Sequence, residues 1–209
     1  MKVLLINGSP NKQGCTNEAL SVVARTLAEE GVESEMAWIG REALRGCQAC
    51  QACKRMGENR CTFGDDVVNG LIEAASRADG IIIGSPVYYA GANGGLLAVL
   101  DRMFYAGGSV LAFKPAAAVA SARRAGTTPT IDQINKYFQI NCMPVVPSTY
   151  WPMVHGSKPE DVHRDEEGVQ TMENLARNMA WMLHAFAAAK EAGIDHPFPV
   201  LEARTNFVR

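Results

Sequence analysis

The chain has 209 residues, of which 20 are lysine or arginine and 22 are aspartate or glutamate, and its formal net charge is -2. This near balance provides no basic surface that would favour nucleic acid or anionic lipid as a partner. No apolar run approaches the roughly 20 residues needed to span a bilayer. The first apolar run stops at Ile6, which is too short for a signal peptide. We therefore expect a cytoplasmic protein that binds neither nucleic acid nor membrane.

Strand-like and helix-like segments alternate along the chain. Short apolar runs predict strands at residues 2–7, 32–39, 79–86, 115–121 and 143–147. Apolar residues at helical spacing predict helices at residues 16–31, 66–78, 94–105, 130–141 and 169–192. This alternation predicts an α/β domain over residues 1–192, with a parallel sheet covered by helices on both faces. Residues 193–209 carry Pro197 and Pro199 without periodicity, and we expect them to form a C-terminal tail.

Three loops should meet at one edge of this sheet. Ligands of such sheets bind outside the carboxyl ends of the strands. The segments that follow the first, third and fourth predicted strands are residues 8–17, 85–95 and 121–128.

The first of these loops has the features of a phosphate site. A strand ends at Gly8-Ser9-Pro10 and a helix begins near Thr16, so that free backbone N–H groups and the positive end of the helix dipole face the loop. The neutral donors in the loop are Ser9, Asn11, Thr16 and Asn17. Cys15 follows Gly14 where a P-loop needs lysine, so a terminal monophosphate fits better than a triphosphate. The alternative is an ordinary capped helix whose glycines serve only the turn.

The second loop carries two adjacent tyrosines, Tyr88 and Tyr89, among several glycines. Tyrosine rings stack on planar ring systems, and glycine permits close backbone approach to a ligand. The alternative is that both rings pack against the following helix.

The combination of motifs resembles the NADPH-dependent FMN reductase family of flavodoxin-like proteins. The resemblance rests on Gly8-Ser9-Pro10 with Thr16-Asn17, on residues 78–88 and on Leu100-Asp101-Arg102, and it runs over about residues 1–190. It implies a flavodoxin-like three-layer sandwich with a five-stranded parallel sheet of order 2-1-3-4-5. The cysteine-bearing insertion would follow the second strand.

The same resemblance implies FMN as cofactor, NAD(P)H as electron donor and a small acceptor such as a flavin or quinone. The first loop would hold the FMN phosphate, the second would line the isoalloxazine, and the third would close over the far side of the ring. The implied FMN-binding residues are Ser9, Asn11, Gly14, Cys15, Thr16, Asn17, Pro86, Val87, Tyr88, Tyr89, Ser121, Arg124 and Gly126. Arg123 and Arg124 would supply charge near the ring, or form solvated surface. We expect Asp101 and Arg102 to be a structural or interface pair, and no residue is assigned as catalytic.

Four of the six cysteines form the pattern C-x2-C-x2-C-x7-C, at Cys47, Cys50, Cys53 and Cys61. Cysteines that cluster in a chain expected to be cytoplasmic favour a metal or redox role over a disulfide framework. The first three repeat the spacing with which ferredoxins hold a [4Fe-4S] cluster, whereas zinc sites more often use separated pairs. The pattern also resembles the iron–sulfur flavoprotein branch of the same group. The four are thus candidate ligands, while Cys15 and Cys142 are not expected to ligate.

Two departures keep an alternative open for these cysteines. The last gap is long, and Thr62 stands where ferredoxins have proline. The alternative is free or redox-active thiols in a helix-like segment beside the flavin.

Three functions follow from these patterns. The leading one is an FMN-dependent oxidoreductase. The others are an iron–sulfur flavoprotein that takes electrons from a ferredoxin-like donor, and a non-catalytic flavodoxin-like binding protein. A flat flavin at a sheet edge needs cover, which a neighbouring subunit provides in the resembling families, so we expect a homodimer or homotetramer. His155 is a candidate proton donor, or a structural histidine.

Overall fold

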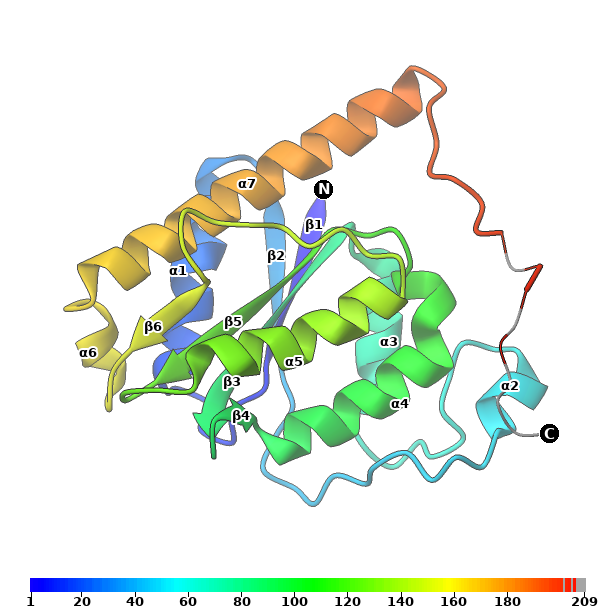
Figure 1. Ribbon diagram of the computed structural model, residues 1–209, viewed down its shortest axis with the longest axis horizontal. Coiled ribbons are helices and arrows are strands. Elements are labelled where there is room, and N and C mark those ends of the chain that lie inside the picture. The colour runs from blue at the N-terminus through cyan, green and yellow to red at the C-terminus, as the bar shows by residue number, and fades with distance from the viewer. Residues whose placement is uncertain (201, 204, 206–209) are drawn as a thin grey trace.

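A computed structural model describes residues 1–200, 202–203 and 205 of the chain (Figure 1). The strands are β1 (Lys2–Asn7), β2 (Glu33–Trp38), β3 (Gly80–Tyr88), β4 (Gly91–Ala92), β5 (Ala116–Ala122) and β6 (Met153–His155). The helices are α1 (Cys15–Glu29), α2 (Ala52–Met56), α3 (Val68–Arg77), α4 (Gly94–Leu111), α5 (Thr127–Ile140), α6 (Pro159–Val162) and α7 (Glu166–Glu191).

The sheet has the expected order. Its neighbouring strands are β2-β1-β3-β5-β6, all parallel, which confirms the predicted 2-1-3-4-5 arrangement. The short strand β4 lies off this path and pairs antiparallel with the end of β3. The chain therefore folds back on itself at the carboxyl edge of the sheet, where the second predicted loop lies.

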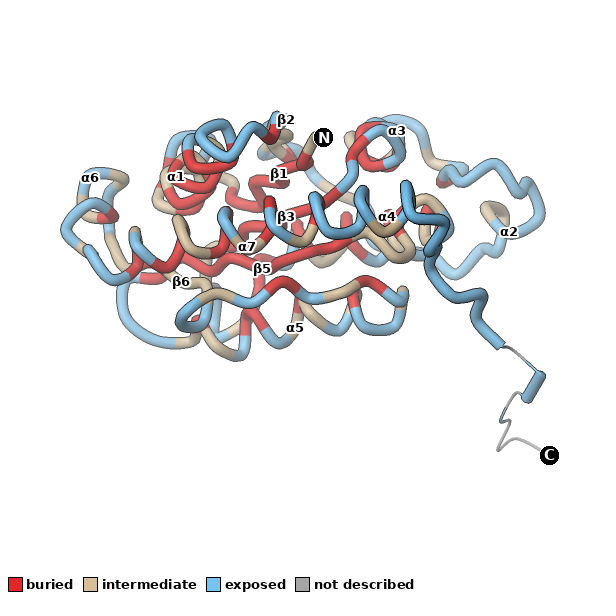
Figure 2. Tube along the Cα trace, turned by 90° about the horizontal axis from the view of Figure 1, so that it is seen from above, coloured by how far each residue is buried: buried red, intermediate tan, exposed pale blue. Residues whose placement is uncertain are grey.

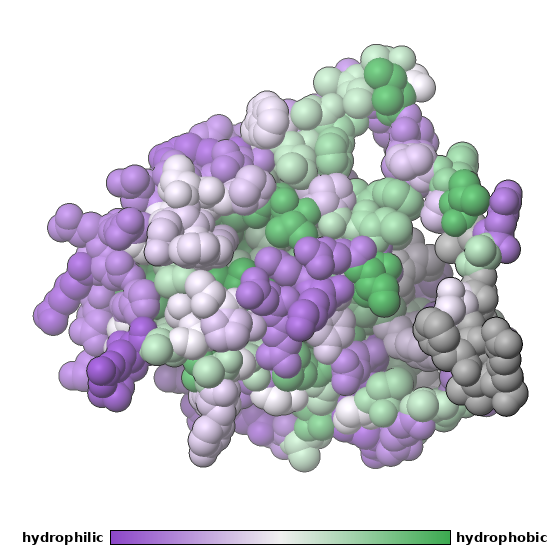
Figure 3. Space-filling model, viewed as in Figure 1, coloured by the Kyte–Doolittle hydropathy of each residue, from purple (hydrophilic) through white to green (hydrophobic). Residues whose placement is uncertain are grey.

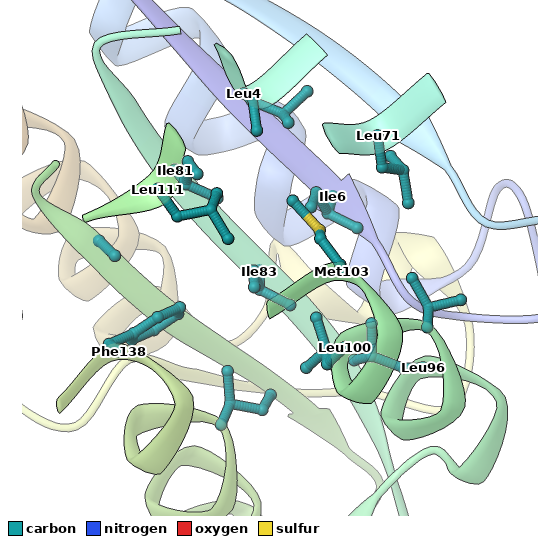
Figure 4. Packing of buried hydrophobic residues seen from close by; sticks show 14 of the residues in the cluster. Leu4, Ile6, Leu71, Ile81, Ile83, Leu96, Leu100, Met103, Leu111 and Phe138 are labelled. Atoms are coloured by element: carbon teal, nitrogen blue, oxygen red, sulfur yellow. The ribbon is translucent and has the colours of Figure 1, made fainter. Parts of the chain in front are cut away.

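Alternate residues of the strands fill two separate cores, which Figure 2 shows as buried chain on both faces of the sheet. On one face Val3 and Leu5 pack with residues of α1 and α7. On the other face Leu4 and Ile6 pack with residues of α3, α4 and α5, among them Phe138 (Figure 4). Burial on both faces explains why these strands read as continuous apolar runs.

The last strand is not where the sequence placed it. Residues 143–147 form a single bridge between Val145 and Ala116 instead of a strand. Pro144 and Pro147 lack the N–H group that a strand ladder requires, so the chain leaves the sheet there. It returns as β6, with Met153 paired to Ala120 and His155 paired to Ala122. The segment around His155 therefore forms the fifth strand of the parallel path rather than following it.

The helix α7 extends beyond the body of the molecule. Its buried residues end at Leu183, and the helix continues to Glu191. Residues 194–200 then continue from the end of α7 without regular structure (Figure 1). In the described part of the chain, no helix is both long and apolar enough to cross a bilayer.

Candidate functional site at the carboxyl edge of the sheet

The first loop leaves the N-terminus of α1 open. Gly14 is the residue before the helix, and among the described residues no side chain caps it. The backbone N–H of Ser9 donates to Asn7 Oδ1 (3.0 Å), and Ser9 Oγ accepts from the N–H of Asn11 (3.1 Å). Asn7 Nδ2 donates to Lys12 O (3.2 Å). The loop is thus ordered by its own side chains, and among the described residues it leaves the first turn of α1 without a side-chain cap, the arrangement that an anion site uses.

Two side chains that the sequence analysis missed fix this loop from the side of β2. Trp38 Nε1 donates to Ser9 O (2.7 Å), and Arg41 Nε donates to Pro10 O (2.7 Å). Lys12 Nζ lies 5.5 Å from the Trp38 ring centroid. The register that pairs Asn7 with Trp38 places Trp38 at the same edge as the loop. Ligands bind at the carboxyl ends of the strands, so the same reasoning applied to the second strand would have predicted Trp38 at the site.

The three expected loops do meet. Thr16 Oγ1 and Ser121 Oγ lie 2.8 Å apart, which joins the first loop to the third. Gly126 has a φ of +95°, and a Cβ atom there would lie 2.7 Å from Ala90 Cα and 2.8 Å from Val87 Cγ1. The third loop therefore touches the second so closely that a side chain would not fit.

The second loop presents its tyrosines to solvent. Tyr88 is 48% exposed and Tyr89 is fully exposed. Tyr89 and Ala90 both have positive φ angles, 49° and 58°, which non-glycine residues rarely adopt. The Tyr89 ring is therefore free for a ligand instead of packed against α4. Arg123 and Arg124 are exposed at the same edge.

Next to the first loop lie a thiol and a histidine, because the place of a Cβ atom on Gly156, which follows His155, is 3.3 Å from Cys15 Sγ. Burial raises the pKa of the Cys15 thiol, an effect that the Asp161 and Glu160 charges reinforce and a backbone hydrogen bond partly opposes. A neutral thiol does not repel a phosphate. His155, at the end of β6, has its Nδ1 3.2 Å from Asp165 Oδ2. Asp165 also accepts from the backbone N–H of His155 (2.7 Å), so this carboxylate orients the ring.

The four clustered cysteines lie around one cavity. Cys47 and Cys50 are exposed, Cys53 is half-buried and Cys61 is buried. Residues 43–51 have no regular structure and α2 begins at Ala52, so the proposed helix-like arrangement of the thiols is wrong for the first two. All four line a cavity of about 20 Å³ whose other wall includes Arg102 and Tyr105 of α4. Among the described residues, no three His, Cys, Asp or Glu side chains are placed to hold a metal ion.

Asp101 and Arg102 do not act as a pair. Asp101 Oδ1 accepts from Tyr137 Oη (2.5 Å), on the side of α5. Arg102 is only 1% exposed, points toward the cysteine segment and forms an ion pair with Asp66. Burial lowers the pKa of Arg102, but hydrogen bonds to Asp66 and Cys61 outweigh it, so the net shift is upward and the guanidinium stays charged.

The sheet order and the three loops are those of a flavodoxin-like protein. Among solved structures, the chain resembles a flavodoxin, WrbA-like protein from Agrobacterium tumefaciens, with a TM-score of 0.62 and 13% identity over 88% of this chain and 98% of the other. It also resembles an NADH:FMN oxidoreductase in its apo form, with a TM-score of 0.63 and 20% identity over 87% and 89% of the two chains. At these identities the likeness establishes the fold.

Sequence similarity shows the family to which the chain belongs. Residues 1–158 match the NADPH-dependent FMN reductase family, and the chain belongs to it. An iron-sulfur flavoprotein of Methanocaldococcus jannaschii is 35% identical over 196 residues, which cover 86% of this chain and 96% of that relative.

Proposed function

We propose that this protein is an FMN-dependent oxidoreductase that is reduced by NAD(P)H and passes electrons to a small acceptor. The observation that carries the proposal is the joining of three loops around the open N-terminus of α1, through Thr16 and Ser121 and through Gly126 and Val87. FMN supplies two-electron hydride exchange when bound. The role of the protein is to position the ring and control its surroundings.

The residues of each loop have distinct parts in this proposal. Ser9, Asn11 and the backbone of residues 14–17 would hold the phosphate, where the helix dipole favours negative charge. Pro86, Val87, Tyr88 and Tyr89 would line one side of the ring. Ser121, Arg124 and Gly126 would close the other side. The exposure of Tyr89 supports a stacking role, because its ring has no partner in its own chain among the described residues.

The first test is the absorption spectrum of the purified protein. Flavin bands, or binding of added FMN followed by bleaching with NAD(P)H, are expected. The absence of both bands and FMN binding would contradict the proposal. Binding of FMN without reduction by NAD(P)H would favour the non-catalytic binding protein instead.

A matched pair of threonine variants sharpens this test. Thr16→Val removes the hydroxyl that lies 2.8 Å from Ser121 Oγ at the phosphate loop. We expect its FMN affinity to fall up to about tenfold, since the hydrogen bond that joins the first loop to the third is lost and such a bond contributes about 0.5–1.5 kcal/mol. Thr26→Val makes the same change at a buried position in the last turns of α1 and should leave the affinity unchanged. If Thr16→Val and Thr26→Val bind FMN with equal affinity, the Thr16 hydroxyl has no part in FMN binding.

We also propose a second cofactor, an iron–sulfur cluster on Cys47, Cys50, Cys53 and Cys61. Its support is that all four thiols line one cavity against α4, although they are not gathered into a ligand set. The donor chemistry fits, because four thiolates are the usual ligands of such clusters. The segment that carries them has little regular structure, so ligation would also order it.

The position of this segment supports electron exchange with the flavin. It leaves the flavin edge at Arg41, and Leu44 Cδ1 lies 3.7 Å from the place a Cβ atom on Gly95 would occupy, in the first turn of α4. Arg102 follows Gly94 by eight residues on the same helix, which is roughly 12 Å at about 1.5 Å per residue. The cluster would then take electrons from a ferredoxin-like donor and exchange them with the flavin.

Anaerobic reconstitution with iron and sulfide analysis tests the cluster. Cys61→Ser should lower bound iron and sulfide, while Cys142→Ser, an exposed cysteine outside the cavity, should not. Near-zero iron and sulfide in the reconstituted wild type would exclude the cluster and leave the flavin proposal intact.

We further propose that the protein acts as a homodimer or homotetramer in the cytoplasm. An open flavin edge favours cover by a second subunit, and six free cysteines suit a reducing compartment.

A further inference from the structure

One face of α4 contacts residues 43–66, the cysteine segment, over two turns of the helix. Its residues Arg102, Tyr105, Ala106 and Ser109 follow the i, i+3, i+4, i+7 spacing that places side chains on one side of a helix. Tyr105 Oη donates to Gln51 Oε1 (3.0 Å), and Ser109 Oγ bonds to Asn59 Oδ1. The cysteine segment thus packs against this face of α4, at the lower right of Figure 1.

Arg102 is the residue at the centre of this face. Its Nη1 donates to Arg45 O (3.1 Å), and its Nη2 donates to Phe63 O (3.0 Å) and to Asp66 Oδ1 (3.2 Å). Nη1 also pairs with Asp66 Oδ2. The remaining donor, Nε, lies 3.3 Å from Cys61 Sγ. Every nitrogen of this buried guanidinium is therefore used, and all of its partners belong to the cysteine segment.

This arrangement differs from a simple buried ion pair. Asp66 balances the charge of Arg102 and accepts from both terminal nitrogens, so the fork cannot rotate. Its fixed orientation leaves Nε directed at a sulfur atom. The hydrogen bond from this cationic donor therefore fixes the position of Cys61 Sγ against α4.

We propose that Arg102 is a positioning residue that holds Cys61 Sγ in place as a cluster ligand and raises the reduction potential of the cluster through the Nε–H···Sγ hydrogen bond. The inference rests on the cluster proposed above. A hydrogen bond to a ligand sulfur stabilises the more negative, reduced form of a cluster, and it is one of the main controls on the potential. Asp66 has the opposite effect, because its negative charge opposes the added electron.

The experiment compares three variants of the reconstituted protein by a redox titration followed by electron paramagnetic resonance. Arg102→Lys keeps the charge but loses the fixed fork, so the reduction equilibrium should fall about tenfold, a shift of about 59 mV to lower potential for one electron. Asp66→Asn removes a negative charge while its amide oxygen still accepts from one nitrogen of Arg102, and Nε remains available to Cys61, so the potential should rise. A purely structural role of Arg102 would not shift the potential in opposite directions in the two variants, since loosening the cysteine segment would affect both alike.

Arg45→Gln is the matched control. Its side chain lies in the same segment, 4.6 Å from the Phe63 ring centroid, but is partly exposed and has no bond to a cysteine. Its charge is screened by solvent, and the potential should stay at the wild-type value. FMN affinity, measured on each variant, serves as the check that the domain is folded.

The outcomes separate the two proposals. Wild-type protein that takes up no iron overturns the cluster and this inference with it. Wild-type protein that holds a cluster, with Arg102→Lys at the same potential and the same iron content, overturns the role of Arg102 alone. If Arg102→Lys fails to fold, Asp66→Asn decides, because an unchanged or lower potential in that variant contradicts the inference.

Discussion

Cys15 lies where the phosphate loop becomes α1, and its protonation state should be visible in its reactivity. Burial raises the pKa of its thiol, and only the thiolate reacts with alkylating agents. At pH 8 Cys15 should therefore react with iodoacetamide several-fold more slowly than exposed Cys142. Its rate should rise as the pH passes its raised pKa. Peptide mapping by mass spectrometry measures both sites in one sample.

Bound FMN should slow the reaction of Cys15 further and leave Cys142 unaffected. A Cys15 that reacts as fast as Cys142 at pH 8 would contradict both its burial and its place beside the phosphate.

Residues of the site were predictable from the sequence where they lie at or just after the carboxyl end of a strand. Thr16 and Gly126 follow strand ends, Val87 and Ser121 lie next to the last residues of β3 and β5, and the structure brings all four together. Arg102 was not predictable, because its partners lie 36 to 57 residues away and depend on how an irregular segment folds over α4. No local pattern distinguishes it from an exposed helical arginine.

At the scale of elements, α4 depends on Gly107 to approach α3. Gly107 departs from helical geometry (φ -108°, ψ 15°), and a Cβ atom there would lie 2.8 Å from Ile72 Cγ2. We expect Gly107→Ala to lower the free energy of unfolding by about 1–3 kcal/mol, the usual cost of overpacking a core. Urea denaturation followed by circular dichroism measures the change.

The control for this change lies on the partner helix. A Cβ atom on Gly70 of α3 would have nothing within 4 Å. Gly70→Ala should therefore raise the free energy of unfolding by up to about 1 kcal/mol through helix propensity. A loss of stability in both variants, or a gain in both, would show that the close approach at Gly107 does not determine the effect.

The elements themselves were largely predictable from hydrophobic period. Four of the five parallel strands and the long helices lie close to their predicted ranges, because the buried strands β1, β3 and β5 are largely apolar and the covering helices are amphipathic. The exception is β6, where an apolar run with two prolines was mistaken for the strand. Met153–His155, only three residues long, has too short a pattern to be recognised without its partner β5.

At the scale of the whole molecule, one apolar groove lies at the opposite edge of the sheet from the flavin site. A cavity of about 660 Å³ opens between the end of α7 and residues 112–115. Its apolar lining includes Phe113, Pro144, Leu183, Phe186, Ala187 and Ile194. Figure 3 shows hydrophobic residues gathered around the far end of α7.

The proposed homotetramer needs a second contact besides the one that covers the flavin edge, and we expect another copy of the chain to pack at this groove. The tail continues past Ile194 with Phe198 and Val200, which are 89% and 78% exposed and have nothing apolar of their own chain to cover them among the described residues. The first tail residues already line the groove in the same chain, where the His196 ring stacks on Phe113 with centroids 4.1 Å apart. Contact with a second copy would cover the tail residues that stay exposed, Phe198 and Val200.

Phe186→Lys should therefore weaken assembly by placing a charge in the groove. We expect light scattering at micromolar concentration to give a dimer or tetramer mass for the wild type and a smaller mass for the variant. His184→Lys adds the same charge on the exposed side of α7, outside the groove, and should keep the wild-type mass. A monomeric wild type would contradict the assembly. Equal masses for both variants and the wild type would place the interface elsewhere, and FMN binding retained by Phe186→Lys would show that the flavin site at the opposite edge forms without the tail contact.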